Sequence, residues 1–202
     1  MPPQPNSERS AATREKLLDA TIDALVELGW AGTSTTEVVR RAGVSRGAQV
    51  HHYPTKQELV LAAVEHLLLR RVDEFAAAFE GLEPGRRTPA AALDLLWRTC
   101  FGGNFEAWLE LAVVARTDPL LHGHLVEVEK RFWTAAYDTF MSMFPQLGGD
   151  EAFARVALRL TFALLDGLAV GRLAGIDSTE LDEVLEAFKT ITAPYFPDEE
   201  TP

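Results

Sequence analysis

Two adjacent histidines, His51 and His52, stand in the stretch Ser45 to Lys56, which has a basic residue near each end. Histidine serves proteins as a metal ligand, as a catalytic base and as a charged contact to phosphate. Two ligands from one helix are normally spaced by three or four residues, because neighbouring side chains diverge by about 100°. The adjacency therefore disfavours a metal site. We expect at least one ring to contact phosphate, and plain packing or solvation of both is the alternative.

Other signals of catalytic or metal chemistry are weak in this sequence. We find no nucleophile elbow, no glycine-rich loop followed by Lys-Ser/Thr, no HExxH motif and no cysteine cluster. His122 and His124, one residue apart, are interpreted as solvated. The single cysteine, Cys100, lies among apolar residues and excludes an intramolecular disulfide, which fits a reducing cytoplasm. We therefore predict that the protein is no enzyme and uses no metal or cofactor.

Composition indicates a globular protein with an uneven charge distribution. The chain has 202 residues, of which 47% are hydrophobic and 24% charged, and its formal net charge is −11. Residues 1–71 carry nine Lys and Arg against eight Asp and Glu, whereas the remaining residues carry ten against 22. The N-terminal part can thus meet phosphate locally. We expect no signal peptide and no membrane span, because neither an apolar h-region nor a run of 18 apolar residues occurs.

The spacing of apolar residues along the chain predicts helices almost throughout. We expect about nine helices, at 11–28, 34–42, 45–53, 56–79, 90–101, 105–117, 119–144, 151–174 and 178–193. No alternating strand pattern of useful length and no internal repeat is evident, so the predicted fold class is all-α. The clearest break is the loop 81–89, with its glycines and prolines.

Two short helices near the N-terminus form a predicted helix-turn-helix motif at about residues 34–53. Ser34 and Glu37 make a capping box at the first helix. Gly43 permits a tight turn with positive φ, and Ser45 caps the second helix, which Pro54 ends.

In such a motif the second helix enters the DNA major groove, while the first crosses the backbone. Arg46 is expected to read guanine and Gln49 adenine, although a buried position for Gln49 is the alternative. Lys56, at the start of the next helix, suits a phosphate. The predicted DNA-binding residues are Ser34, Thr35, Thr36, Ser45, Arg46, Ala48, Gln49, His51, His52 and Lys56.

Residues 11–71 resemble the N-terminal DNA-binding domain of the TetR family of bacterial transcriptional regulators. The resemblance rests on the helix from Arg14 that ends in Gly29-Trp30, on residues 33–36, and on AGVSRGAQVHHYPTKQEL at 42–59. It implies a homodimer of all-helical subunits. The N-terminal three helices would bind a palindromic operator, and the C-terminal domain would dimerise and bind a small effector that releases the DNA. The implied organisation is a flexible arm at 1–10, a DNA-binding domain at 11–71 and a ligand-binding and dimerisation domain at 72–202.

Four positions depart from the family pattern. Val50 stands where the family usually has a tyrosine that contacts phosphate, and Gln49 replaces an apolar residue. Val39 occupies a place usually given to alanine, and Tyr53 one often given to phenylalanine. His52 and Lys56 match the pattern, so the resemblance implies phosphate contacts for both.

The C-terminal part carries aromatic residues and an unusual series of glycines. A lipophilic effector would need an aromatic-lined cavity, and ordinary core packing is the alternative. The predicted pocket residues are Trp97, Phe101, Phe105, Trp108, Tyr137, Phe140 and Asp166. Glycines at 167, 171 and 175 share one helical face and favour close packing against a partner helix; the alternative is that Gly175 only ends the helix and the other two are tolerated. The predicted dimer interface comprises Phe162, Gly167, Gly171, Leu181, Leu185 and Phe188.

The leading hypothesis is a cytoplasmic, homodimeric repressor that binds operator DNA and responds to a small molecule. A regulator without an effector, or an activator, remains an alternative. A helical small-molecule-binding protein with a merely structural helix-turn-helix unit is a further one.

Overall fold

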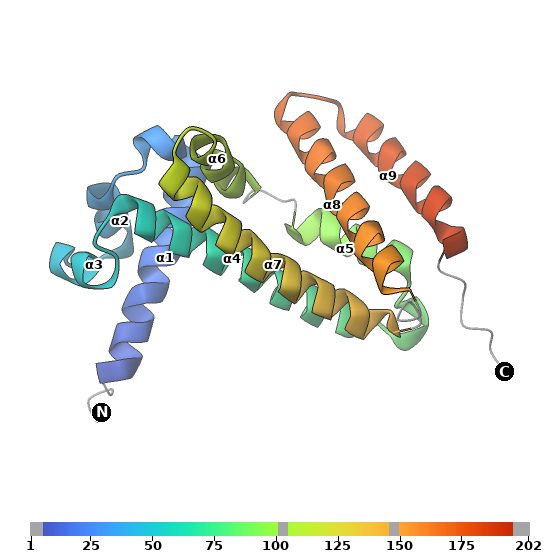
Figure 1. Cartoon of the computed structure of the whole chain (residues 1–202), viewed down its shortest axis with the longest axis horizontal. Helices are drawn as coiled ribbons and strands as arrows, with labels where there is room; N and C mark the ends of the chain where they lie inside the picture. Colours follow the sequence, from blue (N-terminus) through green and yellow to red (C-terminus); the bar gives the residue numbers. More distant parts are fainter. Residues whose placement is uncertain (1–5, 101–104, 146–149, 196–202) are drawn as a thin grey trace. The chain divides into compact units, whose positions relative to one another are not determined.

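The computed structural model describes residues 6–100, 105–145 and 150–195. Within these ranges the chain has nine α-helices and no strand, which confirms the predicted all-α class (Figure 1). The helices are α1 (Asn6–Gly32), α2 (Thr35–Ala42), α3 (Arg46–His52), α4 (Lys56–Glu80), α5 (Pro89–Cys100), α6 (Phe105–Ala115), α7 (Pro119–Met143), α8 (Glu151–Leu173) and α9 (Ser178–Thr192). Short 3-10 helices occupy Pro84–Arg86 and Ala193–Tyr195.

Side-chain caps explain where most of the helices begin. The Ser34 hydroxyl accepts the N–H of Glu37 at the start of α2, and the Thr55 hydroxyl accepts that of Glu58 at the start of α4. Asp177 caps α9 in the same way, through the N–H of Thr179. These are local interactions between residues two or three positions apart, so they can be read directly from sequence.

Helix α1 begins at Asn6, five residues before the predicted start at Ala11. Part of the segment that we expected to be a flexible arm is therefore helical. The segment contains Glu8, an acidic residue in the first turn, where it complements the helix dipole. Glu8 and Arg9 are exposed, so no apolar periodicity marks this first turn in the sequence.

The contacts between helices divide the chain into two compact units. Among the described residues, the first unit comprises 6–70 and 105–135, and the second comprises 71–100, 136–145 and 150–195. Helix α6 and much of α7 thus group with the N-terminal helices, which the division by sequence does not anticipate. In the first unit the core side of α4 is formed by Leu59, Ala63 and Leu67, each at most 1% exposed, as the sequence pattern predicts.

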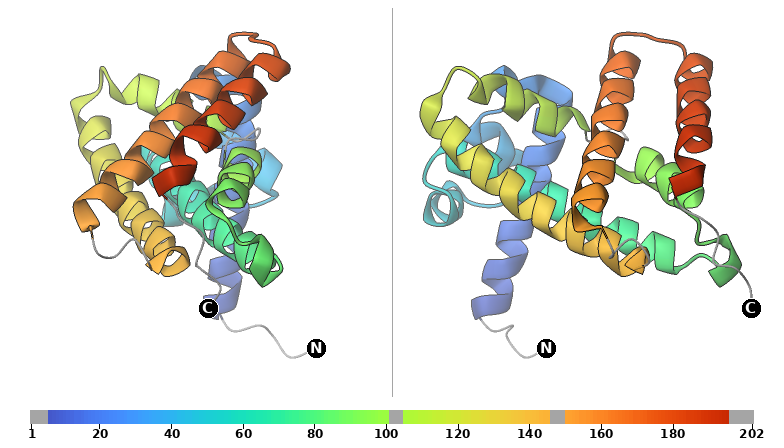
Figure 2. Two further views of the ribbon diagram at one scale, coloured as in Figure 1. Left: turned by 90° about the vertical axis from the view of Figure 1, so that its right-hand side faces the viewer. Right: turned by 45° about the vertical axis from the view of Figure 1, so that its right-hand side comes forward.

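In the second unit, α8 and α9 lie side by side and antiparallel (Figures 1 and 2). Leu165 on α8 and Leu181 on α9 belong to the buried core of this unit. No helix in the part of the chain that the structure describes has the length and apolar character needed to cross a membrane.

Candidate nucleic-acid interface

The turn between α2 and α3 is built as the sequence indicates. Gly43 ends α2 in the left-handed region, with φ 64° and ψ 34°, a conformation that favours glycine. The Ser45 hydroxyl accepts the N–H of Ala48, 3.1 Å away, and so caps α3. Val38, with no exposed surface, fills the core side of α2. These features confirm the predicted helix-turn-helix geometry.

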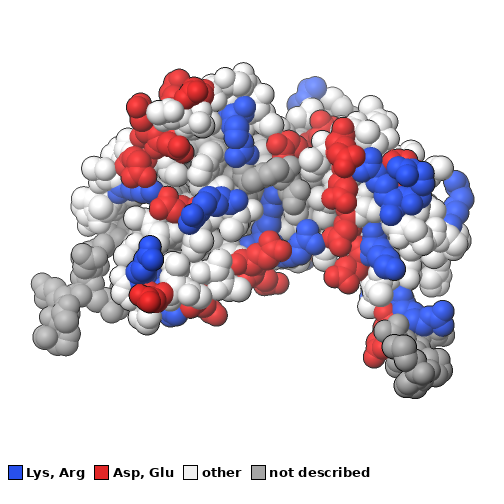
Figure 3. Space-filling view, turned by 180° about the vertical axis from the view of Figure 1, so that it is seen from behind, with Lys and Arg blue, Asp and Glu red and all other residues white. Residues whose placement is uncertain are grey.

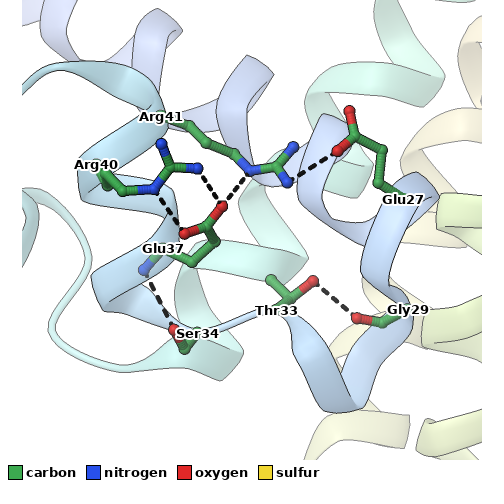
Figure 4. Close-up of polar contacts among 7 residues, drawn as sticks. All are labelled: Glu27, Gly29, Thr33, Ser34, Glu37, Arg40 and Arg41. Carbon is green, nitrogen blue, oxygen red and sulfur yellow. Dashed lines mark hydrogen bonds and ion pairs between the residues drawn. The ribbon is translucent and has the colours of Figure 1, made fainter.

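An ion-pair network fastens α2 to α1 (Figure 4). The Glu37 carboxylate accepts hydrogen bonds from Arg40 and Arg41 on its own helix, at 2.6–2.8 Å. Arg41 also reaches Glu27 on α1, with 2.8 Å between its Nη2 and Oε2. The hydrogen bonds from Arg40 and Arg41 lower the pKa of Glu37 to about 2. Glu37 therefore does not reach back to complete the capping box, and it holds two arginines instead.

One side of α3 faces solvent. Arg46, Gly47, Val50 and His51 are exposed, and their spacing places them on adjoining positions of one helical face. Arginine can read guanine, and an apolar side chain can contact the methyl group of thymine. Val50 is 46% exposed and is therefore available for such an apolar contact, although it cannot make the phosphate contact of the tyrosine that it replaces. Its spacing of four residues from Arg46 is the signal that predicts a shared face.

Gln49 lies on the opposite side of α3 and is only 1% exposed. Its side-chain amide donates to the carbonyl oxygen of Tyr53, at the end of the same helix. The structure therefore favours the alternative of a buried position over the reading of adenine. The physical reason is the carbonyl at the C-cap, which needs a donor and lies four residues away.

His51 and His52 differ in exposure, because neighbouring side chains on a helix point in different directions. His51 is exposed and His52 is half-buried, with ring centroids 5.1 Å apart in an edge-on arrangement. Burial lowers the pKa of His52, and the nearby His51 and Arg14 lower it further. Arg14, an exposed residue of α1, thus adds positive charge beside α3. Arg14 is far from α3 along the chain, so no local spacing in the sequence predicts that the two lie close together.

Lys56 already has partners within the protein. Its Nζ donates to the carbonyl oxygen of Trp30 and lies 4.3 Å from the centroid of the Trp30 ring. Burial lowers the pKa of this ammonium group. A phosphate contact by Lys56 must therefore form at, or in place of, this link between α1 and α4.

The remaining predicted contacts are Thr35, half-buried, Thr36, exposed, and Ala48, half-buried. Residues 34–56 carry four Lys and Arg against one Glu. Figure 3 shows basic side chains where α2 and α3 lie, in contrast with the many acidic ones elsewhere on that face. A local excess of positive charge is what a protein of net charge −11 needs to approach phosphate.

No group of three or more His, Cys, Asp or Glu side chains that could hold a metal ion is found among the described residues. His122 and His124 are both exposed. Neither histidine pair therefore belongs to a larger ligand set in that part of the chain.

The residues predicted for an effector pocket divide between the two units. Phe105 and Trp108 belong to the first unit, with ring centroids 5.5 Å apart. Trp108 also donates its indole N–H to Glu129. Trp97, Tyr137, Phe140 and Asp166 belong to the second unit, and Phe101 lies outside the described residues.

In the second unit, cations cover two of these aromatic rings. The guanidinium of Arg155 lies 4.2 Å from the ring centroid of Tyr137, and that of Arg172 lies 5.2 Å from the ring centroid of Trp97. Phe140 packs against Phe144, with their centroids 5.4 Å apart. These contacts fit the packing alternative as well as a pocket wall.

Most of the residues predicted for a dimer interface face inward. Phe162, Gly171, Leu181 and Leu185 are buried within the chain, Phe188 is half-buried, and only Gly167 is exposed. A Cβ on Gly171 would lie 3.0 Å from Ile176 Cδ1 and 3.4 Å from Leu181 Cδ2, so this glycine serves packing within the chain. Four of the predicted interface residues thus pack inside their own chain, because periodicity does not distinguish the inner apolar face of α8 and α9 from the outer one; their part in a dimer interface stays a prediction.

Comparisons with known proteins agree with this geometry. A family model described as bacterial regulatory proteins, tetR family, matches residues 17–63. The HTH-type transcriptional regulator CymR of Pseudomonas putida is 33% identical over 178 residues, 88% of each chain.

Solved structures extend the similarity to the fold. A transcriptional regulator from Rhodococcus sp. Rha1 is 27% identical with a TM-score of 0.67, covering 92% of this chain and 98% of that one. A chain from Saccharomonospora viridis, solved in complex with choline, has a TM-score of 0.68 at 16% identity. The alignment covers 94% of this chain and 100% of that one. The similarity thus extends well beyond the helix-turn-helix motif.

Proposed function

We propose that this chain, which belongs to the TetR family of bacterial regulatory proteins, is a homodimeric repressor that a small effector releases from a palindromic operator. Its relatives are DNA-binding transcriptional regulators, and the chain is a regulator of that class rather than an enzyme. The observation that carries the proposal is the exposed face of α3, where Arg46, Val50 and His51 stand together on a capped and braced helix. As a regulator that acts on chromosomal DNA, it works in the cytoplasm.

A second copy of the chain is proposed to dock on α8 and α9. Apolar residues that remain exposed form a stripe along α8, at Val156, Leu160, Ala163, Gly167 and Val170. Val156 and Leu160 are 56% and 59% exposed, and a Cβ on Gly167 would meet no atom within 4 Å. Val184 and Ile191 are exposed apolar residues of α9. Such a surface supports self-association through the last two long helices.

The effector is proposed to be small and lipophilic. The aromatic residues of α5 to α7 support this class, because lipophilic ligands bind in largely apolar cavities. A chain of similar fold from S. viridis was solved in complex with choline, which supports a small molecule as effector. An effector-independent regulator or an activator is the alternative, and it predicts that no small molecule dissociates the complex with DNA.

The decisive experiment is binding to the DNA immediately upstream of the protein's own gene, by gel shift and footprinting across a salt series. We expect a protected palindrome and an affinity that falls steeply as salt rises. Arg46→Ala should weaken specific binding about 10- to 100-fold, because a good contact to a guanine contributes about 1–3 kcal/mol. Non-specific binding should change less.

The matched control is Arg86→Ala, which removes the same side chain from an exposed position outside the DNA-binding helices. It should leave operator affinity unchanged. Equal losses in the two variants would show that Arg46 acts only through net charge. If neither this fragment nor random-sequence selection gave a bound site with folded wild-type protein, the proposed function would be refuted.

A further inference from the structure

A carboxylate from α6 holds the junction between α1 and α2. Glu110 Oε2 accepts the backbone N–H of Trp30 at 2.7 Å, although the two residues are 80 positions apart in sequence. Glu110 and Trp30 both belong to the first compact unit. Helix α6 is therefore tied by a charged hydrogen bond to the segment that leads into the helix-turn-helix motif.

The local backbone explains why a carboxylate is useful there. Helical geometry breaks at Gly29, which has φ 64° and ψ −178°. N–H groups at the start of a new helical turn have no acceptor within that turn, and Glu110 supplies one from outside. The absent side chain of Gly29 leaves room for it, because a Cβ there would lie 3.2 Å from Glu110 Oε2.

The other side of the same residue is held by Lys56. The carbonyl oxygen of Trp30 accepts a hydrogen bond from Lys56 Nζ, with 2.5 Å between the two atoms. The same ammonium group lies over the Trp30 ring. Trp30 thus joins two charged side chains, one from α6 at its N–H and one from α4 at its carbonyl oxygen. Any change in the position of the Trp30 peptide changes where the ammonium of Lys56 can lie.

We infer that Glu110 is a positioning residue for DNA binding, which acts through the Trp30 peptide to place Lys56. The inference rests on the proposed function, in which Lys56 contacts a phosphate. It makes α6 a structural part of the DNA-binding unit, as the grouping of residues 105–135 with the N-terminal helices also indicates.

The first readout needs no DNA. In Glu110→Ala the N–H of Trp30 loses its acceptor, and we expect its hydrogen exchange to accelerate about tenfold or more, the effect typical of a charged hydrogen bond. Glu110→Gln keeps an oxygen acceptor and should retain most of the protection. Asp23→Asn removes an equal charge from an exposed position of the first unit and is the charge control. Unchanged exchange in Glu110→Ala would overturn the inference.

The second readout is operator affinity in a double-mutant cycle with Lys56→Ala. Glu110→Ala should weaken operator binding. The slope of the logarithm of the binding constant against the logarithm of the salt concentration should become shallower by about one, as the loss of a single phosphate contact makes it. Glu110→Gln should restore most of the affinity and the slope. In the Lys56→Ala background, Glu110→Ala should have little further effect.

The outcomes separate this inference from the proposed function. Wild-type protein that binds no operator overturns both. Wild-type binding together with normal affinity in Glu110→Ala overturns the inference alone. If Glu110→Ala reduces operator affinity equally in the wild-type and Lys56→Ala backgrounds, Glu110 does not act through Lys56, and the inference is again refuted. If Glu110→Ala fails to fold, as circular dichroism would show, Glu110→Gln is compared with Asp23→Asn instead, and a small loss of operator affinity is expected only in Glu110→Gln.

Discussion

At the scale of single residues, Gln49 and Val50 illustrate how adjacent side chains on a short helix take opposite roles. The polar one is buried and satisfies a backbone carbonyl, while the apolar one is 46% exposed. Composition alone would suggest the reverse assignment. The hydrogen bond to Tyr53 makes the difference, because a buried helix end without partners is costly.

This arrangement predicts that Gln49→Ala affects stability rather than base preference. The change leaves the Tyr53 carbonyl without its donor and opens a small cavity, so the free energy of unfolding should fall by about 1–3 kcal/mol. Val50→Ala, at an exposed site, should change it by no more than about 0.5 kcal/mol. Denaturant unfolding measures both values, and operator selection measures base preference. A Gln49→Ala protein of normal stability and relaxed specificity would contradict the assignment.

At the scale of elements, the network of Glu27, Arg41 and Glu37 fixes the angle at which α2 leaves α1. Helix α2 has only eight residues, and helices of that length are not stable alone. Its orientation therefore depends on tertiary contacts, of which Val38 supplies the apolar part and the ion pairs the polar part.

The network predicts an acid-sensitive contribution to stability. The pKa of Glu37 is about 2 in the folded protein, below its ordinary value of 4.5. Because the folded-state pKa is the lower one, the contribution is complete above about pH 4.5 and is lost as pH falls toward 2. Wild-type protein should unfold less readily than Glu37→Gln near neutral pH, and the difference should narrow between about pH 5 and pH 3. Urea titrations at several pH values measure it.

Glu183→Gln, at an exposed position of α9, is the control for this prediction. Its difference from wild type should stay small at every pH. A gap between wild type and Glu37→Gln that stays constant down to pH 3 would show that the ion pairs do not stabilise the fold.

At the scale of the whole molecule, the exposed apolar stripe on α8 predicts a dimer that a single charge disrupts. In a symmetric dimer Leu160→Glu places two unpaired carboxylates at the interface, so the dissociation constant should rise by about 100-fold or more. Sedimentation over a concentration series measures this. Leu120→Glu makes the same change at a leucine that is 80% exposed and outside the stripe, and it should leave association unchanged. A Leu160→Glu protein as dimeric as the wild type would exclude α8 from the interface.

Local chemistry determined much of this protein from sequence alone. The all-α class, the helix starts at Ser34, Ser45 and Thr55, and the left-handed turn at Gly43 depend on residues within four positions of one another. Such interactions can be predicted from sequence, because the residues that make them are close together along the chain. The outward position of Arg46 and the placement of the helix-turn-helix motif follow from them.

Tertiary structure alone decided which apolar face is covered and which distant groups meet. The helical period places Leu181 and Val184, three positions apart, on adjoining parts of one apolar face of α9, yet it does not say that the first is buried and the second exposed. The inward packing of Gly171 and the burial of Gln49 depend on neighbours that the fold supplies. The hydrogen bond between Glu110 and Trp30 joins residues 80 positions apart. Helical spacing predicts only contacts between residues a few positions apart, and a pair this distant meets only when the packing of the helices closes the long loop between them.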